Sequence, residues 1–296
     1  MHRLALVGAL VAIGAAWGLS MPLLRVATST GRGPFGLMLW QNVVMLALLL
    51  PLLRLARLPI PPARGNLRLF ALVAGFGAVI PGFFTFLTAA ALPAGVRAII
   101  IAMIPMFVLP MALAMGFERP DVRRALGVVL GAAAVALLVL PQAGVTRDVG
   151  VLMVLLALVA PASYGIEATY LAWRGAHGLH PFQLVLGATT VGLLATLPLA
   201  FATGQLFAPW PLGPAEAALL GSGVLNVLAY SGYVWLIARA GSVFASLISY
   251  LITGFGVLFS RLLLDESYSP LVWLALALMV AAVALVQPLG ASAKRP

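Results

Sequence analysis

The chain has 296 residues, of which 63% are hydrophobic and 8% charged, and its mean hydropathy is +1.13. Soluble domains carry about 25% charged residues, so a water-soluble fold is excluded. The absence of cysteine excludes disulfides, iron–sulfur clusters and thiolate chemistry. The formal net charge is +10, but the basic residues stand singly or in pairs between apolar runs, a pattern of membrane flanks rather than of a nucleic-acid-binding face.

Long apolar segments follow one another along the whole chain. A membrane-spanning helix needs about 20 mostly apolar residues, and ten segments meet this condition. The expected spans are residues 4–24, 35–53, 69–91, 95–117, 122–140, 149–173, 182–202, 215–238, 243–264 and 271–288. Because every linker between them is short, we expect an all-α membrane protein of ten transmembrane helices without a soluble domain.

The two halves of the chain repeat each other. Five matches occur in order at offsets of 147 or 148 residues: Trp17-Gly18 with Tyr164-Gly165, Pro34-Phe35 with Pro181-Phe182, residues 50–52 with 197–199, Glu118 with Glu266, and residues 133–137 with 281–285. We therefore expect two five-helix repeats, residues 1–141 and 149–288, around a central cavity. Because five is odd, the second repeat must be inverted in the membrane.

The distribution of arginine agrees with inversion. The loop after the second span carries Arg54, Arg57, Arg64 and Arg68, whereas its equivalent in the second repeat, residues 201–215, carries no basic residue. Summed over ten spans, the side that holds both termini has 12 of the 17 basic residues. Basic residues accumulate on the cytoplasmic side of membrane proteins. The sequence therefore predicts a multi-pass protein of the cell inner membrane with both termini in the cytoplasm.

Two inverted five-helix halves are typical of secondary transporters, which bind substrate near the membrane midplane between the repeats. The chain has no P-loop, no H-E-x-x-H and no G-x-S-x-G motif, and its three histidines lie outside the deep parts of the spans. We therefore expect a transporter with no cofactor and no metal, rather than an enzyme. The alternatives from other classes are a multi-pass membrane enzyme and a structural membrane scaffold.

Glu167 is the one carboxylate that lies clearly inside an expected span. A charged group in lipid is costly, so such residues are usually functional. We expect Glu167 either to exchange protons or to pair with an ammonium group of the substrate. The structural alternatives are a position near the aqueous end of the helix and an ion pair with an arginine such as Arg25. The repeat equivalent of Glu167 is Ser20, so either functional role is asymmetric.

Other polar and aromatic residues mark a shared cavity. The repeat relates the turn of Trp17 and Ser20 to the turn of Tyr164 and Glu167, and polar residues recur at helical spacing in spans eight and nine. Interfacial or packing roles for the aromatic residues, and backbone hydrogen bonds for the serines, are the structural alternatives. The expected substrate-binding residues are Trp17, Ser20, Tyr164, Glu167, Asn226, Tyr230, Ser246 and Tyr250.

Prolines and glycines inside the spans indicate kinks and close helix contacts. Pro22, Pro105 and Pro161 each remove a helical N–H, so they are expected as kinks or hinges. Gly127-x-x-x-Gly131 in the Ala-rich fifth span permits close helix approach. This pattern indicates either internal packing or a homodimer formed through spans five and ten. Arg97 and Arg239 stand at loops that correspond within a few residues in the two repeats, and we expect both to be anchors at the membrane interface.

The sequence resembles the drug/metabolite transporter superfamily, EamA type. The resemblance is carried by ten spans in two repeats, by Trp17-Gly18, and by the segment from Pro105 to Glu118, which ends Gly116-Phe117-Glu118-Arg119. The second copy ends Leu264-Asp265-Glu266, and there Thr253 stands where the family has proline.

The resemblance implies a function and a place for the cavity. It implies an exporter of small metabolites, foremost amino acids and above all aromatic or bulky apolar ones, similar to aromatic amino acid exporters. The cavity is then formed by spans one, three, four, six, eight and nine. A drug or phosphorylated-metabolite carrier of the same fold is the alternative. A phosphate would need Lys or Arg in the cavity, and the spans supply almost none.

Overall fold

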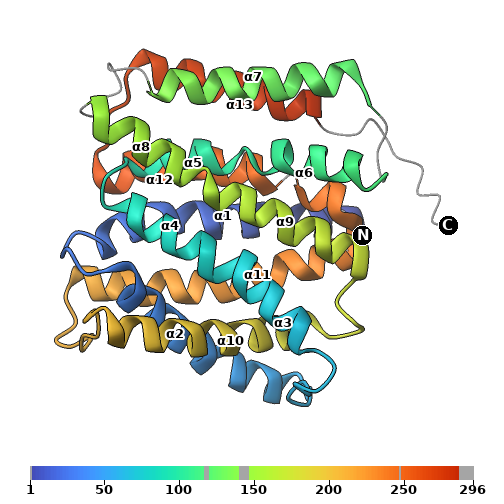
Figure 1. The fold of residues 1–296 in the computed structure, drawn as a ribbon, viewed down its shortest axis with the longest axis vertical. Helices are drawn as coiled ribbons and strands as arrows, with labels where there is room; N and C mark the ends of the chain where they lie inside the picture. The colour runs from blue at the N-terminus through green and yellow to red at the C-terminus, as the bar shows by residue number, and fades with distance from the viewer. Residues whose placement is uncertain (1, 117–119, 140–146, 247, 287–296) are drawn as a thin grey trace.

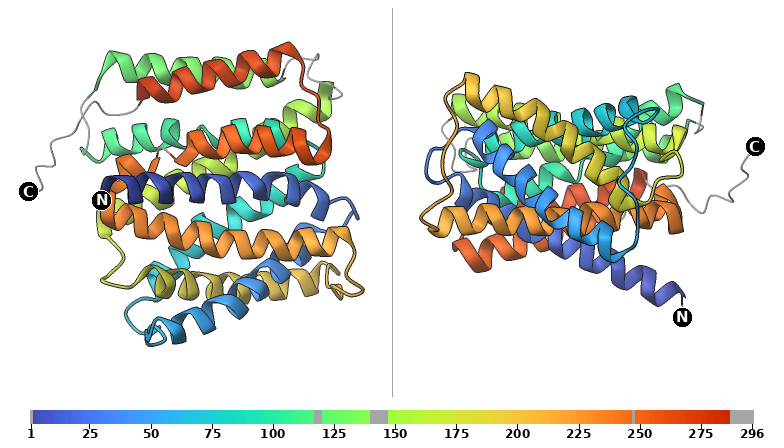
Figure 2. Two further views of the ribbon diagram at one scale, coloured as in Figure 1. Left: turned by 180° about the vertical axis from the view of Figure 1, so that it is seen from behind. Right: turned by 90° about the horizontal axis from the view of Figure 1, so that it is seen from below.

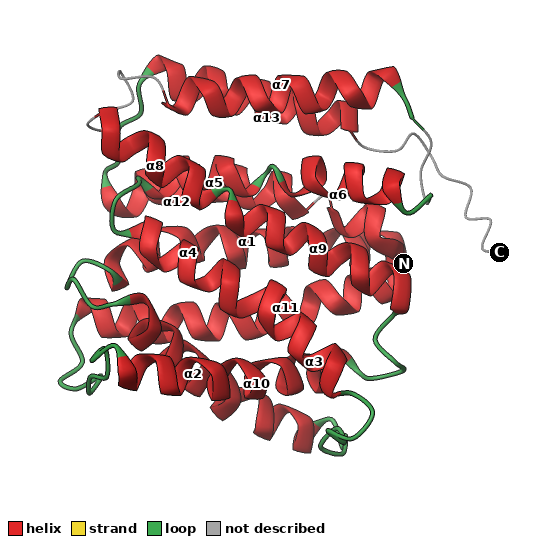
Figure 3. Cartoon of the chain, in the orientation of Figure 1, coloured by secondary structure: helices red, strands yellow, loops and turns green. Residues whose placement is uncertain are grey.

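The computed structural model describes residues 2–116, 120–139, 147–246 and 248–286, and these residues contain helices but no strand (Figure 3). The helices group into ten rods, most of which run side by side across the molecule while α3, α4 and α9 run obliquely (Figure 1). In chain order the rods are α1 (His2–Ala27); α2 (Pro34–Leu55); α3 (Leu67–Ala74) with the π-helix η1 (Gly75–Val79) and α4 (Ile80–Ala89); α5 (Ala94–Ile101) with α6 (Ile104–Ala114); α7 (Val122–Val139); α8 (Arg147–Ala157) with α9 (Val159–Arg174); α10 (Pro181–Ala202); α11 (Pro214–Ser246); α12 (Ile248–Leu264); and α13 (Pro270–Val286).

The rods correspond to the ten expected spans, and the all-α prediction is confirmed. Within the described ranges, 7 rods are long and apolar enough by themselves to cross a membrane, and three shorter apolar helices, at residues 125–134, 248–264 and 270–282, complete the set. Glu118 and Arg119, which carry part of the family resemblance, lie outside the described residues.

Two of the rods break just before a proline. Pro105 is the second residue of α6, which follows a short break after α5, and Pro161 lies in the first turn of α9, which follows the break after α8. A proline ring clashes with the carbonyl of the preceding turn but is tolerated in the first turn of a new helix. At Pro22 there is no such break, because α1 runs uninterrupted from His2 to Ala27.

The boundary between spans eight and nine differs from the expectation. We expected a break at residues 239–242, but α11 continues through Gly241 to Ser246, and the next helix begins at Ile248. One glycine costs a helix only about 1 kcal/mol relative to alanine, and this segment has no proline. The expected break is therefore wrong in position by several residues.

The packing of the rods has an approximate two-fold symmetry. The α1 helix packs on α11 and α12, and its counterpart α9 packs on α4 and α6. The α2, α5 and α7 helices each pack on their own counterparts, which are α10, α12 and α13. Exchanging the two repeats therefore converts each contact into another contact of the same set. The α7–α13 pair lies at one end of the long axis, and α2 and α10 lie at the other (Figures 1 and 2).

A pair of glycines in equivalent positions brings the repeats together. A Cβ atom added to Gly18 of α1 would lie 2.6 Å from the Cβ of Phe255 on α12. A Cβ atom added to Gly165 of α9, 147 residues later in the sequence, would lie 3.1 Å from the Cβ of Phe107 on α6. Close helix approach at small residues is the main packing device available in lipid. The two glycines therefore allow the same close helix contact between the repeats twice, once at α1–α12 and once at α9–α6.

Glu266 ties the second repeat to the first. It lies in the loop between α12 and α13, and its carboxylate accepts the backbone N–H groups of Ala94 (2.9 Å) and Gly95 (3.3 Å) at the start of α5. The Tyr268 hydroxyl donates to the same carboxylate at 2.5 Å. Burial, and then the neighbouring Glu266, raise the pKa of the Tyr268 hydroxyl well above its usual range. The carboxylate thus caps the first N–H groups of a helix in the other repeat.

Candidate functional site

A cavity of about 690 Å³ lies between the two repeats. Its wall is formed by residues of both halves, from α1, α2, η1, α4, α5, α6, α8, α9, α10, α11 and α12. The cavity is large enough for a molecule of amino-acid size. Of the eight residues expected from the sequence to bind substrate, the structure places six in this wall: Trp17, Ser20, Tyr164, Glu167, Asn226 and Tyr230.

The remaining two expected residues are placed differently. Tyr250 is half-buried and packs against the apolar cluster around Met106 and Val257, while its neighbour Ser249 lines the cavity. Successive residues on a helix are rotated by about 100°, so Ser249 and Tyr250 do not share a face. Ser246 is the last residue of α11, and its side chain lies outside the described part of the structure.

Glu167 is buried in the cavity wall, with 3% of its surface exposed. The hydroxyl of Tyr230 on α11 donates a hydrogen bond to its carboxylate. Arg25, a possible partner in the sequence analysis, instead donates to the backbone carbonyls of Ala89 and Ala90. Within the described ranges the one ion pair, between Arg32 and Glu216, lies elsewhere. The Glu167 carboxylate is therefore held by a neutral donor.

The π-helix η1 brings backbone directly against this carboxylate. A Cβ atom added to Gly77 would lie 2.6 Å from the Glu167 carboxyl group and 2.6 Å from the Tyr230 hydroxyl oxygen. A Cβ added to Gly75, in the same π-helix, would meet nothing within 4 Å. Single π-turns are frequent at functional sites. Sequence reasoning missed Gly77, and its only signal was the pair of glycines in mid-span, shortly before Pro81.

Aromatic side chains form the wall beside Glu167. The indole Nε1–H of Trp17 donates to Asn226 Oδ1 at 3.2 Å. The Trp17 ring lies 5.6 Å from the ring of Tyr233 and 6.4 Å from that of Tyr230, both in tilted arrangements. Contacts of this kind stabilise ring pairs beyond their burial alone. Tyr164 also lines this cavity, so the two repeat-related turns face the same space.

Polar side chains of α2 complete the lining, and each donates a hydrogen bond to a residue of the second repeat. Gln41 donates to the hydroxyl of Ser222 at 3.2 Å, and Asn42 donates to the hydroxyl of Thr196 at 3.4 Å. Gln41, Asn42 and Ser222 all line the cavity. Their hydrogen bonds join α2 to α10 and α11, so they also hold the repeats together.

Arg97 is placed differently from the expectation. Its side chain is 3% exposed, lines the cavity from α5 and donates from Nη2 to the Met21 carbonyl at 2.8 Å. An anchor at the membrane interface would be exposed, as Arg239 is. The sequence was misleading because Arg97 stands one turn from the end of an apolar run, where flanking arginines are common. The α5 helix begins at Ala94 and carries the side chain inward.

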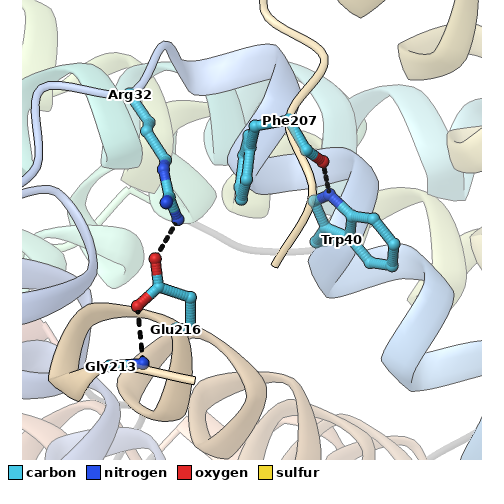
Figure 4. A network of polar contacts seen from close by, with 5 residues as sticks. All are labelled: Arg32, Trp40, Phe207, Gly213 and Glu216. Carbon is cyan, nitrogen blue, oxygen red and sulfur yellow. Dashed lines mark hydrogen bonds and ion pairs between the residues drawn. The ribbon is translucent and has the colours of Figure 1, made fainter. Parts of the chain in front are cut away.

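A polar network joins the repeats at one end of the bundle (Figure 4). Arg32, between α1 and α2, pairs with Glu216 at the start of α11, and its guanidinium lies 4.1 Å from the ring centroid of Phe207. Glu216 also accepts the Gly213 N–H at 3.0 Å, and Trp40 donates to the Phe207 carbonyl at 2.8 Å. This network fastens the loop after α1 to the loop after α10.

The same kind of loop contact occurs where the chain enters α10 and α2. At the start of α2, the Phe35 N–H donates to the Gln205 side chain at 2.8 Å. At the start of α10, in the corresponding place of the other repeat, the Gln183 side chain donates to the Pro59 carbonyl in the loop after α2 at 2.9 Å.

Among the described residues, no three His, Asp or Glu side chains come together as a metal site requires.

Comparison with known proteins agrees with this architecture. The model of the EamA-like transporter family matches residues 4–140 and again residues 149–287. No curated protein matches the sequence. A crystal structure of a protein superimposes with a TM-score of 0.62 and 19% sequence identity, over 94% of this chain and 96% of that chain, which shows a shared fold. The chain belongs to the EamA-like transporter family, whose members are membrane transporters of small molecules.

Proposed function

We propose that the protein exports amino acids, foremost aromatic or bulky apolar ones, across the cell inner membrane by alternating access. The observation that carries the proposal is the cavity between the repeats, which combines the aromatic wall of Trp17, Tyr164 and Tyr230 with one buried carboxylate, Glu167. An amino acid with an apolar side chain offers a matching pair of features, an apolar body and an ammonium group.

Glu167 is the ionisable residue on which transport depends in this proposal. A carboxylate that is buried beside a neutral phenol, rather than beside a cation, is poorly stabilised as an anion. It is therefore suited to receive either the substrate's ammonium group or a proton. Both roles require the carboxyl group itself, so replacement by the isosteric amide tests them together.

The symmetry of the contacts supports alternating access. The α1–α12 and α9–α6 contacts are equivalent, so an arrangement that opens one end of the cavity has a counterpart that opens the other. In the expected orientation, with both termini in the cytoplasm, the Arg32–Glu216 network lies on the outer side. We propose that this network closes the outer end and separates when the cavity opens outward.

The test is counterflow into liposomes that contain the purified protein, with a panel of radiolabelled amino acids. We expect aromatic and bulky apolar amino acids to be exchanged well above protein-free liposomes, and small polar ones less. Absent counterflow across the whole amino-acid panel would reject amino acids as the substrate class, and equal counterflow of every amino acid would reject the preference for aromatic and bulky apolar ones. Sugar phosphates belong in the same panel, because their exchange in place of amino acids would favour the phosphorylated-metabolite alternative.

The role of Glu167 is tested by Glu167→Gln in the same assay. We expect at least a tenfold loss of counterflow, because the amide provides neither negative charge nor a titrating proton. Exchange at the wild-type rate at every pH between 5 and 8 would remove Glu167 from the mechanism. The exposed carboxylate of Asp121, replaced by Asn, is the matched control and should leave counterflow unchanged.

A further inference from the structure

Arg97 is a buried cation with unused hydrogen-bond donors. Its guanidinium makes one hydrogen bond, from Nη2 to the Met21 carbonyl, while Nε and Nη1 are buried without a partner. Arginine carries five N–H donors in a rigid plane, so three of them, on Nε and Nη1, are unpaired. The side chain belongs to the wall of the cavity. Buried polar groups are almost always paired in native proteins, so three unpaired donors here require an explanation.

The surroundings of Arg97 do not neutralise its charge. The charged groups near enough to act on it are another cation, Arg25, and one carboxylate, Glu266. That carboxylate is already engaged by the N–H groups of Ala94 and Gly95 and by the Tyr268 hydroxyl. In addition, Arg97 lies in the first half of α5, where the helix dipole adds positive potential. This end of the cavity is therefore short of negative charge.

The opposite sign is found at Glu167. That carboxylate takes a hydrogen bond from Tyr230, and among the described residues no cation pairs with it. The cavity thus contains one unpaired acid from α9 and one incompletely paired base from α5, without an ion pair between them. Two opposite buried charges that do not pair with each other carry a desolvation cost, unless another molecule supplies each of them with a partner.

We propose that Arg97 is an anion subsite of the cavity and binds the carboxylate of the transported molecule. The inference rests on the proposed function and deepens it, because it makes a carboxylate, in addition to an apolar body, a requirement for binding. Nε and Nη1 are closed off from the cavity space in this structure, so the guanidinium has to turn toward the cavity before these donors give the carboxylate charge-assisted hydrogen bonds. Neutral analogues that lack the negative charge leave these donors unpaired and bind more weakly.

The experiment compares two ligands that differ at the carboxylate alone. Purified protein is titrated with L-phenylalanine and with its primary amide, in competition with radiolabelled L-phenylalanine, at pH 6, where both carry the ammonium group. For the wild type we expect the amide to bind about 10- to 100-fold more weakly, which is the cost of losing a charge-assisted bond. In Arg97→Met this preference should fall to about threefold or less, and Arg97→Lys should keep part of it.

Two further measurements separate binding from a structural role. If Arg97 only supports the fold, Arg97→Met should melt at a lower temperature and weaken both ligands equally, and that result would overturn the proposal. We expect instead an unchanged or higher melting temperature, because methionine removes a poorly paired buried charge. The exposed Arg68, replaced by Gln, is the control for loss of one positive charge and should keep the wild-type preference.

The outcomes also distinguish this inference from the proposed function. If the wild type binds L-phenylalanine and Arg97→Met keeps the full preference over the amide, the anion subsite is wrong while amino-acid binding stands. If the wild type exchanges no amino acid in the counterflow panel, the proposed function fails, and the carboxylate assignment fails with it.

Discussion

Gly77→Ala tests the contact between the π-helix and the buried carboxylate. The added methyl group would lie 2.6 Å from the carboxyl group of Glu167 and from the hydroxyl oxygen of Tyr230. This distance is roughly 1 Å inside van der Waals contact. The side chain of Glu167 is flexible near its end, so it can move away from the methyl group, and its hydrogen bond with Tyr230 is then lost.

The expected magnitude follows from two opposing effects. Overpacking costs about 1–3 kcal/mol, while alanine in place of glycine returns up to about 1 kcal/mol of helix propensity. The protein should therefore fold with a melting temperature only a few degrees lower. Loss of a hydrogen bond to a charged group costs about 1.5–3 kcal/mol, which corresponds to a roughly 10- to 100-fold loss of transport if that bond positions Glu167 in the transition state.

The assay is counterflow in liposomes with Gly77→Ala and Gly75→Ala side by side. Gly75 lies in the same π-helix, and a Cβ atom there meets nothing within 4 Å. Gly75→Ala should transport like the wild type and melt at an equal or slightly higher temperature. Equal transport by the two variants would refute the claim that the π-helix positions the carboxylate.

The aromatic wall and the helix contacts give two more predictions. Trp17→Phe keeps a ring but removes the N–H that donates to Asn226. Substrate binding should weaken about 3- to 10-fold, while thermal melting should show that the fold is retained. A loss of thermal stability as large as the loss of binding would indicate that Trp17 has a packing role alone. Gly18→Leu should prevent α1 from approaching Phe255, so that size-exclusion chromatography shows no folded protein. Gly8→Leu should be tolerated, because a Cβ atom at Gly8 meets nothing within 4 Å. Normal folding of both variants would contradict the close contact at Gly18.

The ten rods were predictable because lipid makes apolar length the dominant signal. The inverted arrangement followed from an odd number of spans in each repeat. The boundary between α11 and α12 was not predictable, since helix propensity alone carries α11 past Gly241. The placement of the halves also depends on small residues such as Gly18 and Gly165, whose role as contact points becomes visible only with the partner helix in place.

The cavity was predictable where residues carried an unusual chemical signal. A carboxylate in an apolar run singled out Glu167, and the repeat then pointed to the turn of Trp17. Arg97 gave no such signal, because an arginine near the end of an apolar run is more often a membrane flank. Tyr250 was expected in the cavity but packs in an apolar cluster. Neighbouring residues on a helix point about 100° apart, so the sequence does not decide whether residue 249 or residue 250 faces the cavity. Gly77 has no side chain, so only the three-dimensional contact reveals it.

The chain lacks cysteine, so a single introduced thiol can report whether the cavity is wet and accessible. Ala168→Cys places the thiol in the cavity wall beside Glu167, and Val129→Cys places it on α7, where the side chain is 65% exposed on the outside of the bundle. Maleimides react with the thiolate, which forms in water and not in lipid. In right-side-out or in inverted vesicles, a membrane-impermeant maleimide should label Ala168→Cys rapidly, and L-phenylalanine should slow this labelling. Labelling of Val129→Cys should be negligible in both kinds of vesicle. Labelling of Ala168→Cys no faster than that of Val129→Cys from either face would contradict a substrate-accessible cavity between the repeats.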